Sequence, residues 1–178
     1  TLSLLISLSF LLLGGFAYVD RIATGYSDHA VVQALVFFGL LGLGSFLINL
    51  PLDLFNTFVI EERFGFNKTS LSTFIGDKVK TLLLTVVLGG GILALLTWLY
   101  QALGPYFWIA GWLVVGSVSI FMAMFYTNLL LPVFNKLTPL EPGALRQSIE
   151  KYASTVEFPL TNIMVMDGSK RSSKANAF

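Results

Sequence analysis

The chain has 178 residues, of which 55% are hydrophobic and only 12% are charged, and its formal net charge is +1. A soluble domain is typically about 25% charged, so this composition excludes an ordinary soluble protein. The small net charge argues against nucleic acid as a partner, and the lack of cysteine excludes disulfides and thiolate metal sites. With a mean hydropathy of +0.78, the chain is expected to be a polytopic membrane protein.

The first half of the chain contains two stretches of membrane-spanning length. A helix needs about 20 apolar residues to cross the hydrocarbon core of a bilayer. Residues 1–19 form the first stretch, which ends at Asp20. Residues 30–50 form the second, which we expect to end at Pro51 because proline interrupts the helical hydrogen-bond ladder.

The most informative feature lies further along, where residues 81–135 contain no Asp, Glu, Lys or Arg. This run is too long for one crossing and about right for two. Gly104-Pro105 breaks it near the middle, which predicts spans at 81–103 and 107–131, the second ended by Pro132. Residues 1–131 are therefore expected to form four transmembrane helices.

Basic residues are distributed unevenly over the segments between these spans. Residues 20–29 contain one, Arg21, and residues 104–106 contain none, whereas the loop 51–80 and the tail 132–178 hold all the others. Lys and Arg concentrate in the cytoplasmic loops of membrane proteins. We therefore predict a multi-pass integral membrane protein with the loop and the tail on the cytoplasmic side.

The loop 51–80 is amphipathic rather than disordered. Thr69 or Ser70 is suited to cap a helix that leads into the third span. The adjacent Glu61 and Glu62 invite an acid–base or metal interpretation. Neighbours on a helix point about 100° apart, however, so a structural or solvated role is expected for both.

The tail 132–178 is predicted to be the start of a folded α+β domain. Apolar residues at helical spacing predict a helix over about 142–156, ended before Pro159. Alternating apolar residues predict a strand at about 161–166, and a second strand is expected from about 175. A turn at Asp167-Gly168-Ser169 separates the two.

The sequence lacks the common catalytic and nucleotide-binding motifs. His29 is the one histidine of the sequence and is expected in a surface loop, so this chain cannot supply an H-E-x-x-H zinc site. It contains no nucleophile-elbow, P-loop or dinucleotide fingerprint. The spans carry no ionisable side chain at their centres, which counts against a proton-coupled transporter.

Three phrases of the sequence nevertheless resemble one family closely. They are FVIEERFGFN at 58–67, PVFNKLTPLE at 132–141, and FPL at 158–160 followed by DGSKRSS at 167–173 and NAF at 176–178. In identity, order and spacing these phrases are similar to the Ste24 type of CAAX prenyl protease, a membrane-embedded zinc metallopeptidase of the M48 class. The resemblance runs from about residue 30 to Phe178.

This resemblance implies seven transmembrane helices around a hydrated chamber. It implies a zinc ion held by the two histidines of H-E-x-x-H and a later glutamate, all downstream of Phe178. The chain is then a segment of a longer enzyme, with no catalytic residue and no metal ligand of its own, and it should be inactive alone. The implied substrates are prenylated C-terminal CAAX peptides or membrane proteins, cleaved beside the lipid bilayer.

Asn176 and Ala177 match the strand that pairs with an extended substrate in this family, and they are the expected substrate-binding residues. The alternative is that Asn176 bonds only to local backbone. Lys174 and Phe178 differ from the histidine and tyrosine of some members, which leaves prenylated peptides and general membrane-protein proteolysis both open. The resemblance gives Glu61, Glu62 and their neighbour Arg63 a docking role beneath the peptidase domain.

Two other functions stay open at this stage. The same chamber could serve transport or lipid handling without cleavage, which would require that no H-E-x-x-H follows Phe178. A scaffold that has lost catalysis is the second alternative, and it would form a stable complex with a larger chain.

Overall fold

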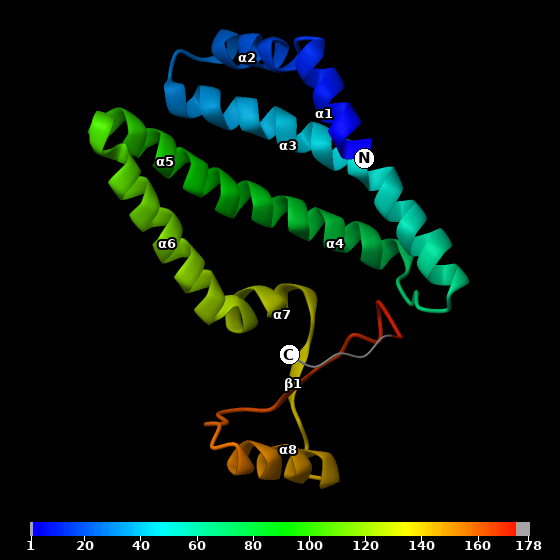
Figure 1. Cartoon of the computed structure of the whole chain (residues 1–178). Helices are drawn as coiled ribbons and strands as arrows, with labels where there is room; N and C mark the ends of the chain where they lie inside the picture. Colours follow the sequence, from blue (N-terminus) through cyan, green and yellow to red (C-terminus); the bar gives the residue numbers. More distant parts are fainter. Residues whose placement is uncertain (1, 174–178) are drawn as a thin grey trace.

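The protein is mainly helical, as its composition predicts (Figure 1). The computed structural model describes residues 2–173. Its α-helices are α1 (Leu2–Leu12), α2 (Gly15–Tyr26), α3 (Ala30–Phe55), α4 (Leu71–Leu84), α5 (Gly90–Leu103), α6 (Phe107–Phe125), α7 (Leu131–Phe134) and α8 (Ala144–Thr155). Shorter helical turns join them at Asn56–Glu61, Thr85–Gly89, Gly104–Tyr106 and Tyr126–Leu130, and the two strands are β1 (Leu137–Pro139) and β2 (Met164–Met166).

The first predicted span, 1–19, is wrong in detail, because it is divided into two helices. Leu4–Leu12 and Gly15–Tyr26 meet at an angle of 66°. The bend falls at Gly14, whose φ of +72° is a left-handed conformation that glycine adopts without steric cost. Asp20 lies inside α2 rather than at its end, since a charge ends an apolar run but does not end a helix.

Helix α3, which corresponds to the second predicted span, passes through Pro51 instead of ending there. This corrects the predicted boundary at residue 50. It continues to Phe55 and then through a π-helical turn to Glu61. The resulting helical run has 32 residues, and an 18-residue window within it has a mean hydropathy of 2.3. Prolines are tolerated in long apolar helices because neighbouring groups satisfy the carbonyl that loses its partner.

Helix α4, which leads into the third predicted span, begins at Leu71 and not at the predicted residue 81. Ser70 caps α4, accepting a hydrogen bond from the backbone N–H of Thr73 at 3.2 Å. Much of the expected loop 51–80 is therefore helical, and its non-helical part is a short hairpin at 64–70. The loop was predicted from the positions of the charged residues. These residues mark the edge of the apolar region, whereas helix α4 extends beyond that edge.

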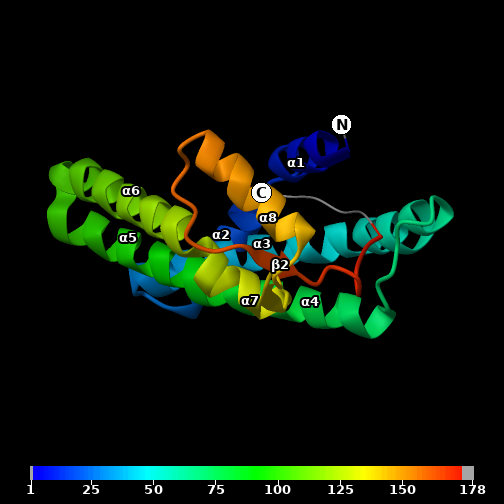
Figure 2. The ribbon, with the colours of Figure 1, turned by 90° about the horizontal axis from the view of Figure 1, so that it is seen from below.

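The charge-free run forms a helical hairpin. The helical segment Leu71–Phe134 folds back at Gly104, where φ is +51°. It has 64 residues, and an 18-residue window within it has a mean hydropathy of 2.3. The α5 and α6 helices then lie side by side, and α5 also contacts α3 (Figures 1 and 2). Within residues 2–173, two helical segments are thus long and apolar enough to cross a membrane, or three if the bent α1–α2 pair forms one span.

In the C-terminal part, α8 lies apart from these helices, whereas residues 167–173 run back to the segment between α3 and α4 (Figure 1). Pro132 is in the first turn of α7 instead of ending the fourth span, because a proline is well placed where the helix has no N–H partner to lose. The helix α8 falls within the predicted range 142–156. The predicted strand 161–166 is shorter, at Met164–Met166, because it forms only where β1 pairs with it.

Strand β1 was not anticipated. It pairs antiparallel with β2, with Leu137 opposite Met166 and Pro139 opposite Met164. Its Thr-Pro sequence is a poor strand pattern, since proline cannot donate to the ladder. The second strand predicted from residue 175 lies outside the described residues.

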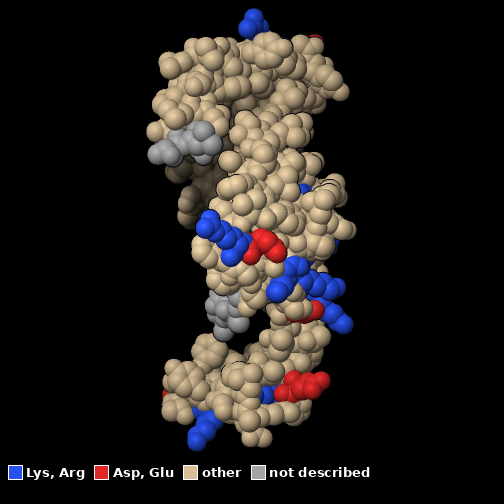
Figure 3. All heavy atoms as spheres, turned by 90° about the vertical axis from the view of Figure 1, so that its right-hand side faces the viewer, with Lys and Arg blue, Asp and Glu red and all other residues tan. Residues whose placement is uncertain are grey.

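The chain buries little of its own apolar surface. Its accessible surface is 13325 Å², whereas a compact globular protein of 19.5 kDa has about 8,500 Å². Exposed Leu, Phe, Trp and Ile side chains cover the helices. On the face shown in Figure 3, charged side chains gather around the 64–70 hairpin and below it, and the region above is nearly free of them. Such a surface requires lipid, or further protein, to cover it.

Candidate functional site

The hairpin that follows the π-helical turn is shaped by a buried asparagine. Asn67 is 8% exposed and donates from Nδ2 to Oε2 of Glu62 at 2.9 Å. Its Oδ1 accepts the backbone N–H of Thr69 at 2.7 Å. Gly65 reverses the chain with a φ of +70°, and the backbone N–H of Phe66 donates to the carbonyl of Glu61 at 2.9 Å. The EERFGFN sequence thus encodes a rigid helix-to-hairpin transition.

A second compact turn forms at residues 167–171. The Asp167 carboxylate accepts hydrogen bonds from the hydroxyl and the backbone N–H of Ser169, at 2.5 and 3.1 Å. These bonds, with a smaller contribution from nearby lysines, hold the pKa of Asp167 below its ordinary value. The backbone N–H of Arg171 donates to the carbonyl of Gly168 at 2.9 Å and closes the turn.

The hairpin and the turn pair with each other through their backbones. The N–H of Lys68 donates to the carbonyl of Arg171 at 3.1 Å, and the N–H of Ser173 donates to the carbonyl of Phe66 at 3.0 Å. These bonds flank an antiparallel bridge between Asn67 and Ser172. The last described residues of the chain therefore contain one isolated antiparallel bridge, at Ser172.

Two side-chain bonds strengthen this backbone pairing. The Thr69 hydroxyl donates to the carbonyl of Arg171 at 3.0 Å, and the Ser173 hydroxyl donates to the carbonyl of Gly65 at 3.1 Å. We call residues 61–69, 135 and 167–173, with Asp77, the junction.

Arg171 ties the junction to two further elements. Its Nε and Nη2 donate to the two carboxylate oxygens of Asp77 on α4, at 2.7 and 2.9 Å. Its Nη1 donates to Oδ1 of Asn135, after α7, at 3.0 Å. The Asp77 carboxylate raises the pKa of Arg171, so the guanidinium stays charged throughout the physiological range. One side chain thus holds α4, the segment after α7 and the turn together.

Helices α3 and α4 are clamped beside the junction. The Lys78 ammonium forms an ion pair with Asp53 of α3 and lies 5.4 Å from the centre of the Phe74 ring. The Phe74 ring in turn meets Phe58 edge to face, with the ring centres 5.6 Å apart. This clamp fixes the direction from which both helices enter the hairpin.

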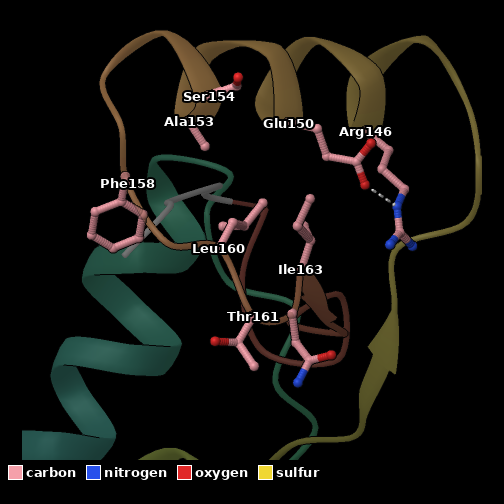
Figure 4. A pocket seen from close by; sticks show the side chains of 9 residues that line it. Arg146, Glu150, Ala153, Ser154, Phe158, Leu160, Thr161 and Ile163 are labelled. Carbon is pink, nitrogen blue, oxygen red and sulfur yellow. Dashed lines mark hydrogen bonds and ion pairs between the residues drawn. The ribbon is translucent and has the colours of Figure 1, made fainter.

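The C-terminal element contains a cavity of about 340 Å³ beneath α8 (Figure 4). Arg146 and Glu150 of α8 form a 2.7 Å ion pair at one side of it, and Phe158 and Leu160 lie at the other. Arg146 also donates to the carbonyl of Leu140 at 2.8 Å, which holds α8 to the segment after β1. The lining is mixed, because Ser154, Thr161 and Asn162 lie beside the apolar Phe158 and Ile163.

The junction contains some of the residues singled out in the sequence and misses others. Glu62 supports the hairpin through Asn67, while Arg63 is exposed. Asn176 and Ala177, the predicted substrate-binding residues, lie outside the described residues.

His29 lies in the turn before α3, where its backbone N–H donates to the Ser27 hydroxyl at 3.1 Å. Asp77 and Asn135 were missed as site residues. Asn135 belongs to a phrase that the resemblance highlights, but no local pattern pairs Asp77 with a residue so far along the chain.

No group of three or more metal-ligating side chains occurs within residues 2–173. Among the carboxylates of the junction, Asp77 pairs with Arg171 and Asp167 accepts a hydrogen bond from Ser169. What the geometry defines is a polytopic, membrane-embedded helical segment joined, through the junction, to the C-terminal element that contains β1, α8 and β2.

Comparison with known proteins assigns this segment to a family. The family model described as the CAAX prenyl protease N-terminal part, with five membrane helices, matches residues 1–136. The CAAX prenyl protease 1 homolog of Mus musculus is 40% identical over 175 residues, which are 94% of this chain and 37% of the relative. CAAX prenyl protease 1 of Saccharomyces cerevisiae is 44% identical over 148 residues, which are 83% of this chain and 33% of the relative.

A solved structure agrees with these relatives. The crystal structure of S. mikatae Ste24p matches with a TM-score of 0.90 and 38% identity, covering 99% of this chain and 42% of that chain. The chain belongs to the CAAX prenyl protease family, as its membrane-embedded N-terminal part. It spans about two-fifths or less of the length of these relatives. The family description counts five membrane helices, where the sequence predicted four.

Proposed function

We propose that this chain forms the membrane wall and the substrate-side approach of a zinc metalloendopeptidase. The observation that carries the proposal is the junction, where the family-like phrases EERFGFN, FNK and DGSKRSS meet through Arg171 and its partners. A catalytic domain must be held in a fixed position relative to the membrane helices if it is to cut beside a bilayer. The junction supplies such an attachment.

The proposed substrates are peptides or proteins with a prenylated C-terminal CAAX sequence, with membrane proteins as the broader class. Relatives of this chain carry the name CAAX prenyl protease. Asn176 and Ala177 are the proposed substrate-contact residues. The antiparallel pairing up to Ser173 supports this role, since extended backbone can present its free edge to an extended peptide.

Zinc is proposed as the cofactor of the full-length protein. The described residues do not fit it, because they provide no cluster of histidine and carboxylate ligands. The ligands would therefore come from another part of the protein. What this chain contributes is the position of the second domain, held by Arg171 and Asn135.

The proposed orientation places residues 51–80 and the C-terminal element on the cytoplasmic side. The uneven distribution of Lys and Arg supports it. Cysteine labelling of residues 1–178 would test it, because these residues contain no cysteine. Single cysteines introduced at Lys68 and at Tyr26 should react with a membrane-impermeant reagent from opposite sides of sealed vesicles.

The test of the function is zinc content combined with cleavage, measured on the full-length protein. About one zinc per chain and release of a tripeptide from a farnesylated CAAX peptide are expected. Asn176→Ala should lower kcat/KM at least tenfold with unchanged zinc content. Asn162→Ala, at an exposed position beneath α8, serves as the matched control. A folded protein that neither binds zinc nor cleaves would favour transport, lipid handling or a scaffold instead.

A further inference from the structure

Lys80 and Lys136 bracket the charge-free run 81–135. The chain between them turns at Gly104 and returns along α6, so both lysines lie at the same end of this helical hairpin (Figure 1). The Lys80 ammonium donates a hydrogen bond to the carbonyl of Val133 at 2.9 Å. Since the charge-free run is the part that enters the hydrocarbon core, the two lysines mark its boundary with the headgroup region.

Both lysines line one cavity of about 620 Å³. Elements far apart in the sequence form it, from α4 to β2. One part of its lining is polar and another is apolar, with contributions from Asn128, Asn135, Leu137 and Met164. A cavity that combines positive charge with an apolar wall fits an amphiphile that has an anionic head.

The neighbouring acids offset the positive charge of this cavity only in part, since Asp77 lies near Lys80 and Asp167 near Lys136 but each carboxylate has another partner. Asp77 gives both carboxylate oxygens to Arg171, and Asp167 accepts from Ser169. Among residues 2–173, the ammonium group of Lys136 forms no hydrogen bond or ion pair. Ammonium groups that form no ion pair at a membrane boundary attract anionic groups.

We propose that this cavity binds an anionic phospholipid, with its phosphate between the ammonium groups of Lys80 and Lys136. A lipid fits better than a soluble anion for two reasons. The site lies where the charge-free helices end, and its apolar wall, which includes Leu137 and Met164, suits the start of an acyl chain. The bound lipid would join the helical hairpin to the first strand of the C-terminal element.

Lipid retention by the full-length protein tests the proposal. The purified protein in neutral detergent is titrated with phosphatidylserine or phosphatidylcholine, and bound lipid is counted by native mass spectrometry. We compare wild type with Lys136→Gln and with the double variant K80Q/K136Q. The matched control is K68Q/K151Q, which removes the same charge from exposed lysines outside the cavity. Thermal midpoints verify that each variant is folded.

A preference for phosphatidylserine is expected, which falls about fivefold in Lys136→Gln and about 25-fold in the double variant. The control should retain the wild-type preference. Lys136→Gln is informative alone, because Lys80 also bonds to Val133 and its loss could weaken the fold. Equal losses in the control, or no preference in wild type, would overturn the proposal. Displacement of the lipid by millimolar inorganic phosphate would also overturn it, in favour of a soluble anion.

Discussion

Arg171 and Asp77 lie 94 positions apart in the sequence and form a two-bond ion pair, with N–O distances of 2.7 and 2.9 Å. The two side chains are only 27% and 24% exposed. Because the pair is partly shielded from water and both oxygens are used, it stabilises the junction more than a surface pair would.

Substitution of Arg171 by lysine should therefore destabilise the full-length protein. Lysine keeps the charge but cannot make the paired bonds to Asp77 or reach Asn135 at the same time. We expect a loss of about 1–2 kcal/mol, seen as a lower thermal midpoint in detergent. Arg21→Lys is the control, because Arg21 is exposed and its side chain donates only a long bond, 3.4 Å, to the carbonyl of Ala17 in its own helix. Equal shifts in both variants would contradict a special role for Arg171.

Asn67→Ala should cost about 1–3 kcal/mol, because it leaves the N–H of Thr69 without its acceptor in a buried position. Asn67→Asp should destabilise the hairpin by more than the loss of the Nδ2 donor alone would, because it places a second negative charge 2.9 Å from the Glu62 carboxylate. Limited proteolysis at the 64–70 hairpin reports the opening directly. The exposed Asn162→Ala should behave as wild type, and a protease-resistant Asn67→Ala would argue against this prediction.

Gly65→Ala should destabilise the hairpin although it creates no clash. No heavy atom lies within 4 Å of an added Cβ, but φ is +70° and a left-handed residue with a side chain costs about 1–2 kcal/mol. Gly76→Ala is the control, since this helical position also has open space and an ordinary φ. It should be neutral or slightly stabilising. Thermal midpoints compare the two, and Gly65→Asn should recover part of the loss.

The turn at Asp167 should weaken in acid. The pKa of Asp167 is lowered in the folded protein by the Ser169 bonds, so the turn's stabilisation is fully present above the ordinary value of 3.8. It is lost as the pH falls through the lowered folded pKa, where the carboxylate becomes protonated. The difference in thermal midpoint between wild type and Asp167→Asn should be constant from pH 7 to 5 and should close below pH 4. A gap that persists at pH 3 would mean that the charge is not responsible.

The sequence predicted the membrane class and the helical fold, because long apolar runs have few other structural outcomes. It misplaced boundaries at Pro51 and Asp20, where an apolar run ends but backbone hydrogen bonding continues. Strand β1 was missed because Thr138-Pro139 has little strand character of its own and depends on β2 for its conformation.

The candidate site was only half predictable. The phrases around Asn67 and Arg171 were visible as family-like sequence, and a turn at Asp167 follows from its residue types. The contact of Arg171 with Asp77 depends on how α4 lies relative to the turn, which no local pattern records. Long-range ion pairs of this kind require the tertiary structure.

The wide sequence separation of Arg171 and Asp77 also orders the events of biosynthesis. At about 5 to 20 residues per second, a ribosome reaches Arg171 roughly 5 to 19 s after Asp77. Both partners of the Asp53–Lys78 clamp, by contrast, have been synthesised as soon as Lys78 follows Asp77. The helices therefore insert and pair first. Until Arg171 is synthesised, Asp77 lies one helical turn from Lys80. Closure of the junction is thus a late step in assembly.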